Sequence, residues 1–556
     1  MQQPLPPRTE ALSSNLPDSF KITGEVFENS EILTRHEFGL NAATPNALKT
    51  LMATGDLAGL GSLDGIFALA WSQTNHLKLY VDASNLCPQY WTRSTNSGPQ
   101  FDASPLQLLS TLRQVPCIAR TGLHEFLRLL DIAAPRTFFD SIFAVPPGSL
   151  LTLDVGEGAR ADDCTTGSGH EPAASFDEAV GTLDQILKLT IARRLTGANR
   201  PATFLSGGID SAVLCAMAAK HDPRITAITV GFEGSDFDES PAAAGIASHL
   251  GVTHQVLRFG RSDYLEAFDC MARGMNQPMA DPATMATLLA FGRCKEQFDV
   301  VLDGTGADEA VGAMPPRHAR LAVGFGSMVP KPLRQLLVHA MSRVPLLAGY
   351  TPLLDFEHPA ETLMRWKGFS RAEIEALCGE SVSLEDTTFY RTFASFPRHC
   401  HYERYSALLN AMPCDRLVQA MRLTGLRVRF PFCARDVDAY LRQLPTEWRH
   451  VPGRPKRILR DLLARYVPPA IWDRPKQGFT FPLQNFLAGE DHALVRRHAI
   501  DGRWLDRGIL QPDRVRQYAR QYIEGDRRLM FRVWALVVLG AWLDAHEDLV
   551  CASPRA

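Results

Sequence analysis

A glycine-rich segment, Ser206-Gly-Gly-Ile-Asp-Ser211, combines residue types that can hold a polyphosphate. Its two glycines let the backbone turn tightly, so that bare N–H groups can approach an anion. A helix that starts directly after the glycines would add the positive end of its dipole. The hydroxyls of Ser206 and Ser211 can donate hydrogen bonds to phosphate oxygens. The carboxylate of Asp210 would repel phosphate, so we expect it to bind Mg²⁺ instead.

A second segment of this kind, Asp303-Gly-Thr-Gly-Ala-Asp-Glu309, follows the apolar run Val300-Val-Leu302. Its glycines permit close backbone approach, and Asp308 offers another carboxylate. Two carboxylates that face the same polyphosphate predict either two Mg²⁺ ions or one shared ion. Neither segment is a Walker loop, and a tight turn with a capping serine is the structural alternative for the first. The occurrence of both segments after apolar runs favours a nucleotide site.

The elements around these segments predict how they are positioned. Short apolar runs alternate with helical patterns, which indicates βαβ units and a parallel sheet. Ligands of such sheets bind beyond the carboxyl ends of the strands, where both segments lie. A helix is expected over residues 211–220, and the chain from about residue 310 onward should be mostly helical. The expected strands are 202–205, 225–231, 253–258 and 299–303.

The first part of the chain has short alternating apolar stretches between turns, which predicts a β-rich domain with a few helices. The clearest stretches are residues 65–71, 77–81 and 148–154. A polar segment rich in Gly, Asp and Thr then marks the best domain boundary. We therefore predict a first domain over residues 1–155, a linker over 156–172 and a second domain over 173–556.

Composition indicates a globular enzyme. The 556 residues are 45% hydrophobic with a formal net charge of −3, and Lys and Arg are scattered, which argues against nucleic acid or an anionic membrane as partner. The eleven cysteines form no Cys-x-x-Cys pair, as expected in a reducing compartment. No signal peptide is visible, and the most apolar stretch, 533–543, is shorter than the roughly twenty residues of a membrane helix. We expect a cytoplasmic protein with no membrane insertion.

With these motifs the chain resembles the asparagine synthetase family of PP-loop ATP pyrophosphatases, which also contains β-lactam synthetases and lasso peptide cyclases. The resemblance implies an α/β fold: an N-terminal glutaminase-like (Ntn-hydrolase-like) β-rich sandwich and a C-terminal PP-loop domain with a parallel sheet and a helical C-terminal part. Further segments that carry it are Val230–Ser240, Asp415-Arg416, Arg427–Phe432, Gly453–Arg460 and Asp473–Phe479.

The resemblance implies ATP and Mg²⁺ as cofactors and assigns roles to single residues. Asp210 and Asp308 would bind Mg²⁺, and Lys476 would be the cation that stabilises an acyl-adenylate and the following tetrahedral intermediate. A solvated lysine is the structural alternative for Lys476, and Lys456 is a weaker candidate of the same type. The nucleotide would contact Leu205, Ser206, Gly207, Gly208, Asp210, Ser211, Val230, Gly231, Asp303, Gly304 and Lys456.

The first domain departs from the family's glutaminase. That half depends on a cysteine directly after the initiator Met, whereas here Gln2 follows Met1 and the first cysteine is Cys87. Where the family often has Arg-Asp-x-x-Gly, this chain has Val81-Asp-Ala-Ser-Asn85. We therefore expect the amine to come from elsewhere than glutamine and the first domain to act as a scaffold or as part of a substrate cleft.

Thr305 stands between the two glycines of the second segment, where ammonia-using relatives resemble Gly-Glu-Gly and β-lactam synthetases have a tyrosine. A threonine hydroxyl is a poor base near neutral pH, whereas a peptide α-amine, with a pKa of about 8, needs little help. This pattern favours a lasso peptide cyclase that joins an Asp or Glu side chain of a core peptide to its N-terminal amine. A precursor peptide, a leader peptidase and a leader-binding protein are the expected partners. The alternatives are a β-lactam synthetase-like small-molecule cyclase, an ammonia-dependent asparagine synthetase-like enzyme, or a catalytically silent scaffold.

Overall fold

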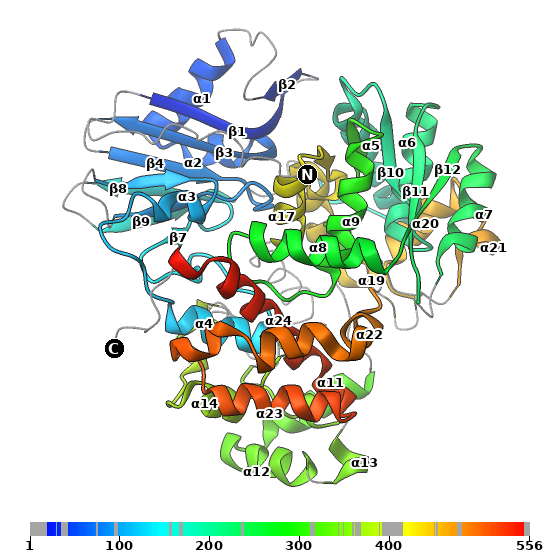
Figure 1. The fold of residues 1–556 in the computed structure, drawn as a ribbon. Coiled ribbons are helices and arrows are strands. Elements are labelled where there is room, and N and C mark those ends of the chain that lie inside the picture. Colours follow the sequence, from blue (N-terminus) through cyan, green and yellow to red (C-terminus); the bar gives the residue numbers. More distant parts are fainter. Residues whose placement is uncertain are drawn as a thin grey trace.

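The structure of the 556-residue chain is a computed structural model (Figure 1). It describes residues 19–28, 31–34, 43–73, 76–93, 98–154, 158–165, 171–234, 238–311, 317–342, 344–348, 350–358, 361, 368–388, 390–391, 415–449, 451, 454–474 and 481–549. Lys476, the expected catalytic cation, lies outside these residues.

The N-terminal part is built on a six-stranded antiparallel sheet of order β2-β1-β3-β4-β8-β9. Along β3, Phe67 and Leu69 pack toward one side and Ala68 and Ala70 toward the other, and all four are buried. Alternating side chains are buried on both faces because helices cover one face and a small sheet, β6-β5-β7, covers the other. The expected β-rich sandwich is confirmed. Its elements are β1 (Ser19–Glu28), β2 (Glu31–Thr34), α1 (Ala43–Thr54), α2 (Leu57–Gly61), β3 (Asp64–Gln73), β4 (His76–Val81), β5 (Tyr90–Thr92), β6 (Gln100–Asp102), α3 (Pro105–Leu109), α4 (Arg120–Leu129), β7 (Phe143–Ala144), β8 (Ser149–Asp154) and β9 (Ala159–Asp163).

Part of the expected linker belongs to this sheet. Residues 159–163 form β9, which pairs antiparallel with β8 from Leu153↔Ala159 to Ser149↔Asp163. The side chains of this edge strand are mostly exposed and polar, so it lacks the alternating apolar pattern that identifies half-buried strands. The N-terminal sheet therefore extends beyond the boundary expected at residue 155.

Asp82, in the segment that departs from Arg-Asp-x-x-Gly, is a buried turn residue. Its carboxylate accepts hydrogen bonds from Phe67 N at 3.0 Å, Ser84 N at 2.8 Å and the Ser84 hydroxyl. Burial raises the pKa of Asp82 to about 6, although the hydrogen bonds from Ser84 oppose this rise. Three residues on, Asn85 has φ +53°, a left-handed conformation that glycine adopts freely and that asparagine tolerates better than most residues.

We expect Asp82 to make stability fall as the pH rises. Because its folded-state pKa lies above the unfolded value of 3.8, its contribution is complete below pH 3.8 and is lost as the pH rises through about 6. The difference in unfolding free energy between wild type and Asp82→Asn should change by up to roughly 3 kcal/mol across this window. Urea titrations from pH 4 to pH 7 measure it. Asp163→Asn is the matched control, because Asp163 makes the same turn with Thr165 on the exposed edge strand; an equal pH dependence in both variants would contradict the assignment to Asp82.

The second part is a five-stranded parallel sheet of order β12-β11-β10-β13-β14 with helices around it (Figure 1). The chain runs from β10 outward through β11 to β12 and then returns to the other side of β10 with β13. β10 and β13 are therefore neighbours at a topological switch point, where such sheets bind ligands. The expected strands and the helix after the first glycine segment are confirmed. The elements are α5 (Phe176–Leu195), β10 (Pro201–Phe204), α6 (Ile209–His221), β11 (Thr226–Phe232), α7 (Ser240–Leu250), β12 (Thr253–Phe259), α8 (Arg261–Gly274), α9 (Ala283–Lys295), β13 (Val300–Leu302), α17 (Asp415–Thr424), β14 (Val428–Arg429), α18 (Arg435–Gln443) and α20 (Arg457–Ala464).

The remaining described segments are helical, as expected. The apolar stretch 533–543 is buried throughout within α24, and Trp542 of that helix packs edge-on against Phe138 of the N-terminal part. Among the described residues, no helix has both the length and the apolar character needed to cross a membrane. These segments are α10 (Ala307–Val311), α11 (Arg317–Met328), α12 (Lys331–Ser342), α13 (Pro345–Ala348), η1 (Thr351–Leu353), α14 (Arg371–Cys378), η3 (Leu384–Asp386), η4 (Pro431–Cys433), α19 (Thr446–Arg449), α21 (Pro469–Trp472), α22 (Leu483–Val495), η5 (Arg496–Ile500), η6 (Arg503–Arg507), α23 (Pro512–Ile523), η7 (Arg527–Leu529), α24 (Met530–Ala545) and η8 (Glu547–Leu549).

Ion pairs join the two parts. Arg429 on β14 forms a two-pronged pair with Glu25 on β1, at 2.8 and 3.0 Å, and Arg194 on α5 pairs in the same way with Asp64 on β3, at 2.7 and 2.9 Å. Both arginine side chains are only 1% exposed. The carbonyl of Arg429 accepts a hydrogen bond from Asp303 N, at 3.0 Å, so this contact lies one strand from the second glycine segment.

Candidate active site

The first glycine loop (residues 206–211) is held in shape by its own serines. β10 leads into it and α6 begins at Ile209, directly after the glycines. Ser206 N donates to the Ser211 hydroxyl at 3.0 Å, and Gly208 N donates to the Ser206 hydroxyl at 3.1 Å. The amides of Ser206 and Gly208 thus converge on oxygen atoms inside the loop. A phosphate oxygen is a stronger acceptor than these hydroxyls, so the loop presents the donors that a polyphosphate requires.

The second glycine loop (residues 303–309) lies against the first. A Cβ atom on Gly304 would come within 3.4 Å of both Asp210 Cβ and Ser211 N, so the two loops are in contact. Asp303 Oδ1 accepts hydrogen bonds from Thr305 N at 2.8 Å and from the Thr305 hydroxyl at 2.6 Å. The proton of the Thr305 hydroxyl therefore points to Asp303, which shapes the turn.

Lys456 connects the carboxylates of the two loops. Its ammonium group forms an ion pair with Asp210 and lies 2.6 Å from Asp308 Oδ1. The side chain is 11% exposed. Burial lowers the pKa of Lys456, but the two carboxylates outweigh this effect and the pKa is raised. Lys456 itself has φ +57°, at the residue that precedes α20. The structure thus brings together three of the expected site residues from segments up to 246 positions apart.

The two carboxylates fit a magnesium ion that also binds phosphate oxygens. Asp210 and Asp308 already converge on one cation, the Lys456 ammonium, so they are the residues that would hold a divalent cation. No group of three or more acidic, His or Cys side chains suited to a metal occurs within the described ranges. The pair of carboxylates, Asp210 and Asp308, is the donor set expected for Mg²⁺. This ion usually binds one or two carboxylates and fills its remaining positions with phosphate oxygens and water.

The other expected nucleotide residues lie on the neighbouring strands. Leu205 is buried at the end of β10, where its N–H donates to Ile228 O at 2.7 Å. Val230 and Gly231 are in β11, next to β10. A Cβ atom on Gly231 would lie 3.3 Å from Arg258 Nη1, so the guanidinium of Arg258 covers this glycine. The strand ends meet as the βαβ pattern predicts.

Glu309 is a site residue that the sequence interpretation did not identify. Its carboxylate accepts a hydrogen bond from Gly306 N at 3.0 Å and so closes the second glycine loop. Burial raises the pKa of Glu309, and the neighbouring charge of Asp308 raises it further. An acidic residue three positions after a glycine, at the start of a helix, is the usual signal for such a cap.

Gly306 should be essential for the shape of this loop. It has φ +101°, and a Cβ atom there would lie 2.7 Å from Cys433 Sγ and 3.0 Å from Cys433 N. We expect Gly306→Ala to lower the unfolding free energy by about 2 kcal/mol and to slow ATP–pyrophosphate exchange. Gly251→Ala is the control, because Gly251 also has positive φ, +68°, but meets no atom within 4 Å. Equal losses in thermal stability for the two variants would show that the contact with Cys433 does not matter.

Comparisons with known protein families agree with this geometry. The model of the family described as asparagine synthase matches residues 182–544, and that of a glutamine amidotransferase domain matches residues 14–162.

Individual relatives are distant in sequence. A glutamine-hydrolysing asparagine synthetase of Bacillus subtilis, numbered 1, is 24% identical over 553 residues, covering 94% of this chain and 84% of the relative. Another from the same organism, numbered 3, is 25% identical over 438 residues, covering 75% and 67%. The carboxyethyl-arginine beta-lactam-synthase of Streptomyces clavuligerus is 25% identical over 219 residues, covering 38% of this chain and 40% of the relative.

Proposed function

The chain belongs to the asparagine synthase family and is an ATP-dependent carbon–nitrogen ligase, and on this premise we propose that it is a lasso peptide cyclase. The proposed substrate is a core peptide with a free N-terminal amine and an Asp or Glu side chain. The carboxylate attacks the α-phosphorus of ATP, which forms an acyl-adenylate and releases pyrophosphate. The N-terminal amine then attacks the acyl carbon, AMP leaves with the C–O bonding electrons, the amine loses a proton, and an amide closes the ring.

The convergence of Asp210, Asp308 and Lys456 beside the first glycine loop carries the adenylation step of this proposal. Asp210 and Asp308 are the residues that would hold Mg²⁺, which when bound neutralises charge on the pyrophosphate that leaves. The loop amides and the Lys456 ammonium would bind the same phosphate oxygens. These groups are already fixed by ion pairs and hydrogen bonds, so they need little rearrangement as charge develops.

The assignment of the amine rests on Thr305. Its hydroxyl donates to Asp303 at 2.6 Å, so it is engaged as a donor in the loop and is not positioned to accept a proton. A substrate amine with a pKa near that of a peptide N-terminus, about 8, is partly neutral at physiological pH and needs no strong base. Both reacting groups belong to one bound peptide, which gives the second step a large proximity advantage.

A second candidate is a β-lactam synthetase-like cyclase that acts on a small β-amino acid. The relative from Streptomyces clavuligerus favours it, although the similarity covers 38% of this chain. A third is an enzyme that uses ammonia or glutamine to amidate aspartate, as the names of the Bacillus subtilis relatives indicate for those proteins. Thr305 argues against both, because each would need a stronger base than a threonine hydroxyl.

Mass spectrometry separates these candidates. The protein is incubated with ATP, Mg²⁺ and candidate core peptides, and we expect a product lighter than the peptide by one water, with AMP and pyrophosphate formed in equal amounts. An N-acetylated peptide is the matched control and should still support adenylation while yielding no ring. Loss of water from a small β-amino acid alone would favour the second candidate, and formation of asparagine from ammonia or glutamine the third; either result would overturn the cyclase proposal.

A further inference from the structure

The helices α11, α12 and α13 turn apolar side chains outward. Among the residues that the structure describes, thirteen large apolar side chains are exposed, and ten of them lie between Leu321 and Tyr350. A concentration of this kind on a protein surface marks an interaction site. The ten are Leu321, Phe325, Met328, Leu333, Leu336, Leu337, Val344, Leu346, Leu347 and Tyr350, which we call the apolar helical surface.

The spacing of these residues shows that whole helix faces are exposed. On α11, Leu321, Phe325 and Met328 recur at positions i, i+4 and i+7, and are between 61 and 76% exposed. Leu333, Leu336 and Leu337 have the spacing i, i+3 and i+4 on α12. Such stripes normally face a protein core, whereas here they face away from it. α12 and α13 form the end of the molecule farthest from α6 in the view of Figure 1.

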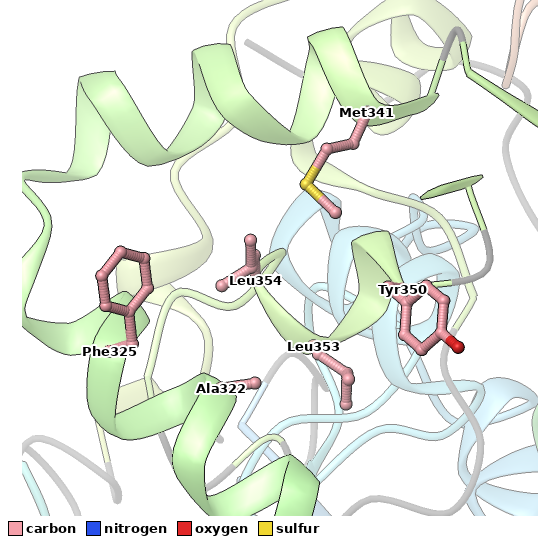
Figure 2. Close-up of a pocket in the computed structure, with 6 residues that line it drawn as sticks. All are labelled: Ala322, Phe325, Met341, Tyr350, Leu353 and Leu354. Atoms are coloured by element: carbon pink, nitrogen blue, oxygen red, sulfur yellow. The ribbon is translucent and has the colours of Figure 1, made fainter. Parts of the chain in front are cut away.

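Between these helices lies an apolar hollow of about 660 Å³. Figure 2 shows Met341 of α12 reaching toward Leu354 and Ala322, with Phe325 and Tyr350 on either side. The hollow has the volume of a typical ligand site but no charged group among its lining residues. It therefore suits a hydrocarbon chain.

The charge of this segment is also unusual. The sequence has no Asp or Glu between Glu309 and Asp355, in a chain with 61 acidic residues, while Arg317, Arg320, Lys331, Arg334 and Arg343 fall within that span. Two of these cations serve the fold. Lys331 pairs with Glu357 and Glu385, and Arg334 is buried and donates to Gly326 O and Phe356 O. The net charge of the whole chain, which argues against an anionic partner, does not reveal this local excess of basic over acidic residues.

We propose that the apolar helical surface docks on the face of an anionic lipid bilayer, with its leucine, methionine and phenylalanine side chains among the acyl chains. Exposed apolar helix faces combined with basic residues and no acidic ones are the pattern of peripheral membrane helices. A second copy of the chain fits less well, because these helices contain no acidic residue that could pair with a basic residue of the other copy. A protein partner also fits less well, because leucine, the commonest residue of this surface, is under-represented among the residues that dominate protein interfaces.

Sedimentation with lipid vesicles tests this proposal without any peptide substrate, so its outcome is independent of the proposed function. The full chain should sediment with vesicles of phosphatidylcholine and phosphatidylglycerol, less with pure phosphatidylcholine, and less at high salt. Met328→Asp with Leu346→Asp should weaken partitioning at least about tenfold, because both side chains lose their transfer to hydrocarbon. The matched control, Val115→Asp with Leu189→Asp, changes the charge equally at two other exposed apolar positions.

Thermal unfolding, which should be unchanged in both double variants, shows that each is folded. Three results would overturn the proposal. One is the absence of sedimentation with anionic vesicles, and another is equal weakening by the two double variants. The third is light scattering that shows an oligomer dissolved by Met328→Asp with Leu346→Asp, which would assign the surface to contacts between copies or with another protein.

Discussion

Asp210→Asn should reduce ATP–pyrophosphate exchange by at least about a hundredfold, because it removes one of two carboxylates that converge beside the first glycine loop. The amide keeps the shape of the side chain but cannot neutralise a divalent cation. Asp308→Asn should have a similar effect, and the two losses should not add, since both carboxylates serve one charge cluster. The exchange reaction is measured with saturating ATP and Mg²⁺ and with the carboxylate substrate present.

Asp269→Asn makes the same change of charge and is the control for this comparison, because Asp269 is 55% exposed on α8 and pairs with Arg273 on the protein surface. It should leave exchange within about twofold of wild type. Thermal unfolding of Asp210→Asn must also be followed, since the variant leaves Lys456 with one acidic partner fewer. An unchanged exchange rate in Asp210→Asn, with the protein folded, would refute adenylation at this site.

The largest loss of stability should come from Arg128→Met, which we expect to cost about 3 to 5 kcal/mol. Arg128 on α4 is 1% exposed and pairs with Glu361, at 2.7 Å, and with Asp355, at 3.1 Å. It also donates to the carbonyl of Phe369 at 3.1 Å. Without the guanidinium, the carboxylate of Glu361, which is fully buried, would keep its desolvation penalty and lose its counter-ion.

Two further variants isolate this effect in denaturant titrations. Arg120→Met, on the same helix, removes an exposed pair with Glu380 and should cost no more than about 1 kcal/mol. Adding Glu361→Gln to Arg128→Met should recover part of the loss, because the buried charge disappears together with its partner. Similar losses for Arg128→Met and Arg120→Met would mean that burial of the pair is unimportant.

Local patterns in the sequence predicted the parts of the site that are local in the chain. The first glycine loop, the strands β10, β11 and β13 and the start of α6 each follow from a short run of residues, because apolar runs, glycines and helix starts act over a few positions. The contact between the two loops followed as well, since parallel strands bring their carboxyl ends to one edge of the sheet.

Features that depend on residues far apart in the chain could not be predicted from these local patterns. Lys456 is a weak candidate in the sequence because a basic residue on a helix face is usually solvated. Its burial depends on a left-handed backbone and on carboxylates from two other segments. The sequence pattern predicts a linker where strand β9 lies, because an edge strand needs no apolar side chains. The exposure of the apolar faces of α11 and α12 could not be predicted from the sequence, since periodicity identifies the apolar face of a helix but not what covers it.

The ion pairs of Arg194 and Arg429 bear on how this two-part chain can change over evolutionary time. Both guanidinium groups belong to the ligase half, yet Asp64 and Glu25, which neutralise them, belong to the amidotransferase-like half. A deletion that removed the N-terminal half would take away Glu25, Asp64 and the Phe27 ring over which both guanidinium groups lie, and would open this contact to water next to the strand that supports Asp303. A shortened descendant would therefore expose a surface built for contact with another protein part, and we expect such a deletion to be accompanied by substitutions at Arg194 and Arg429.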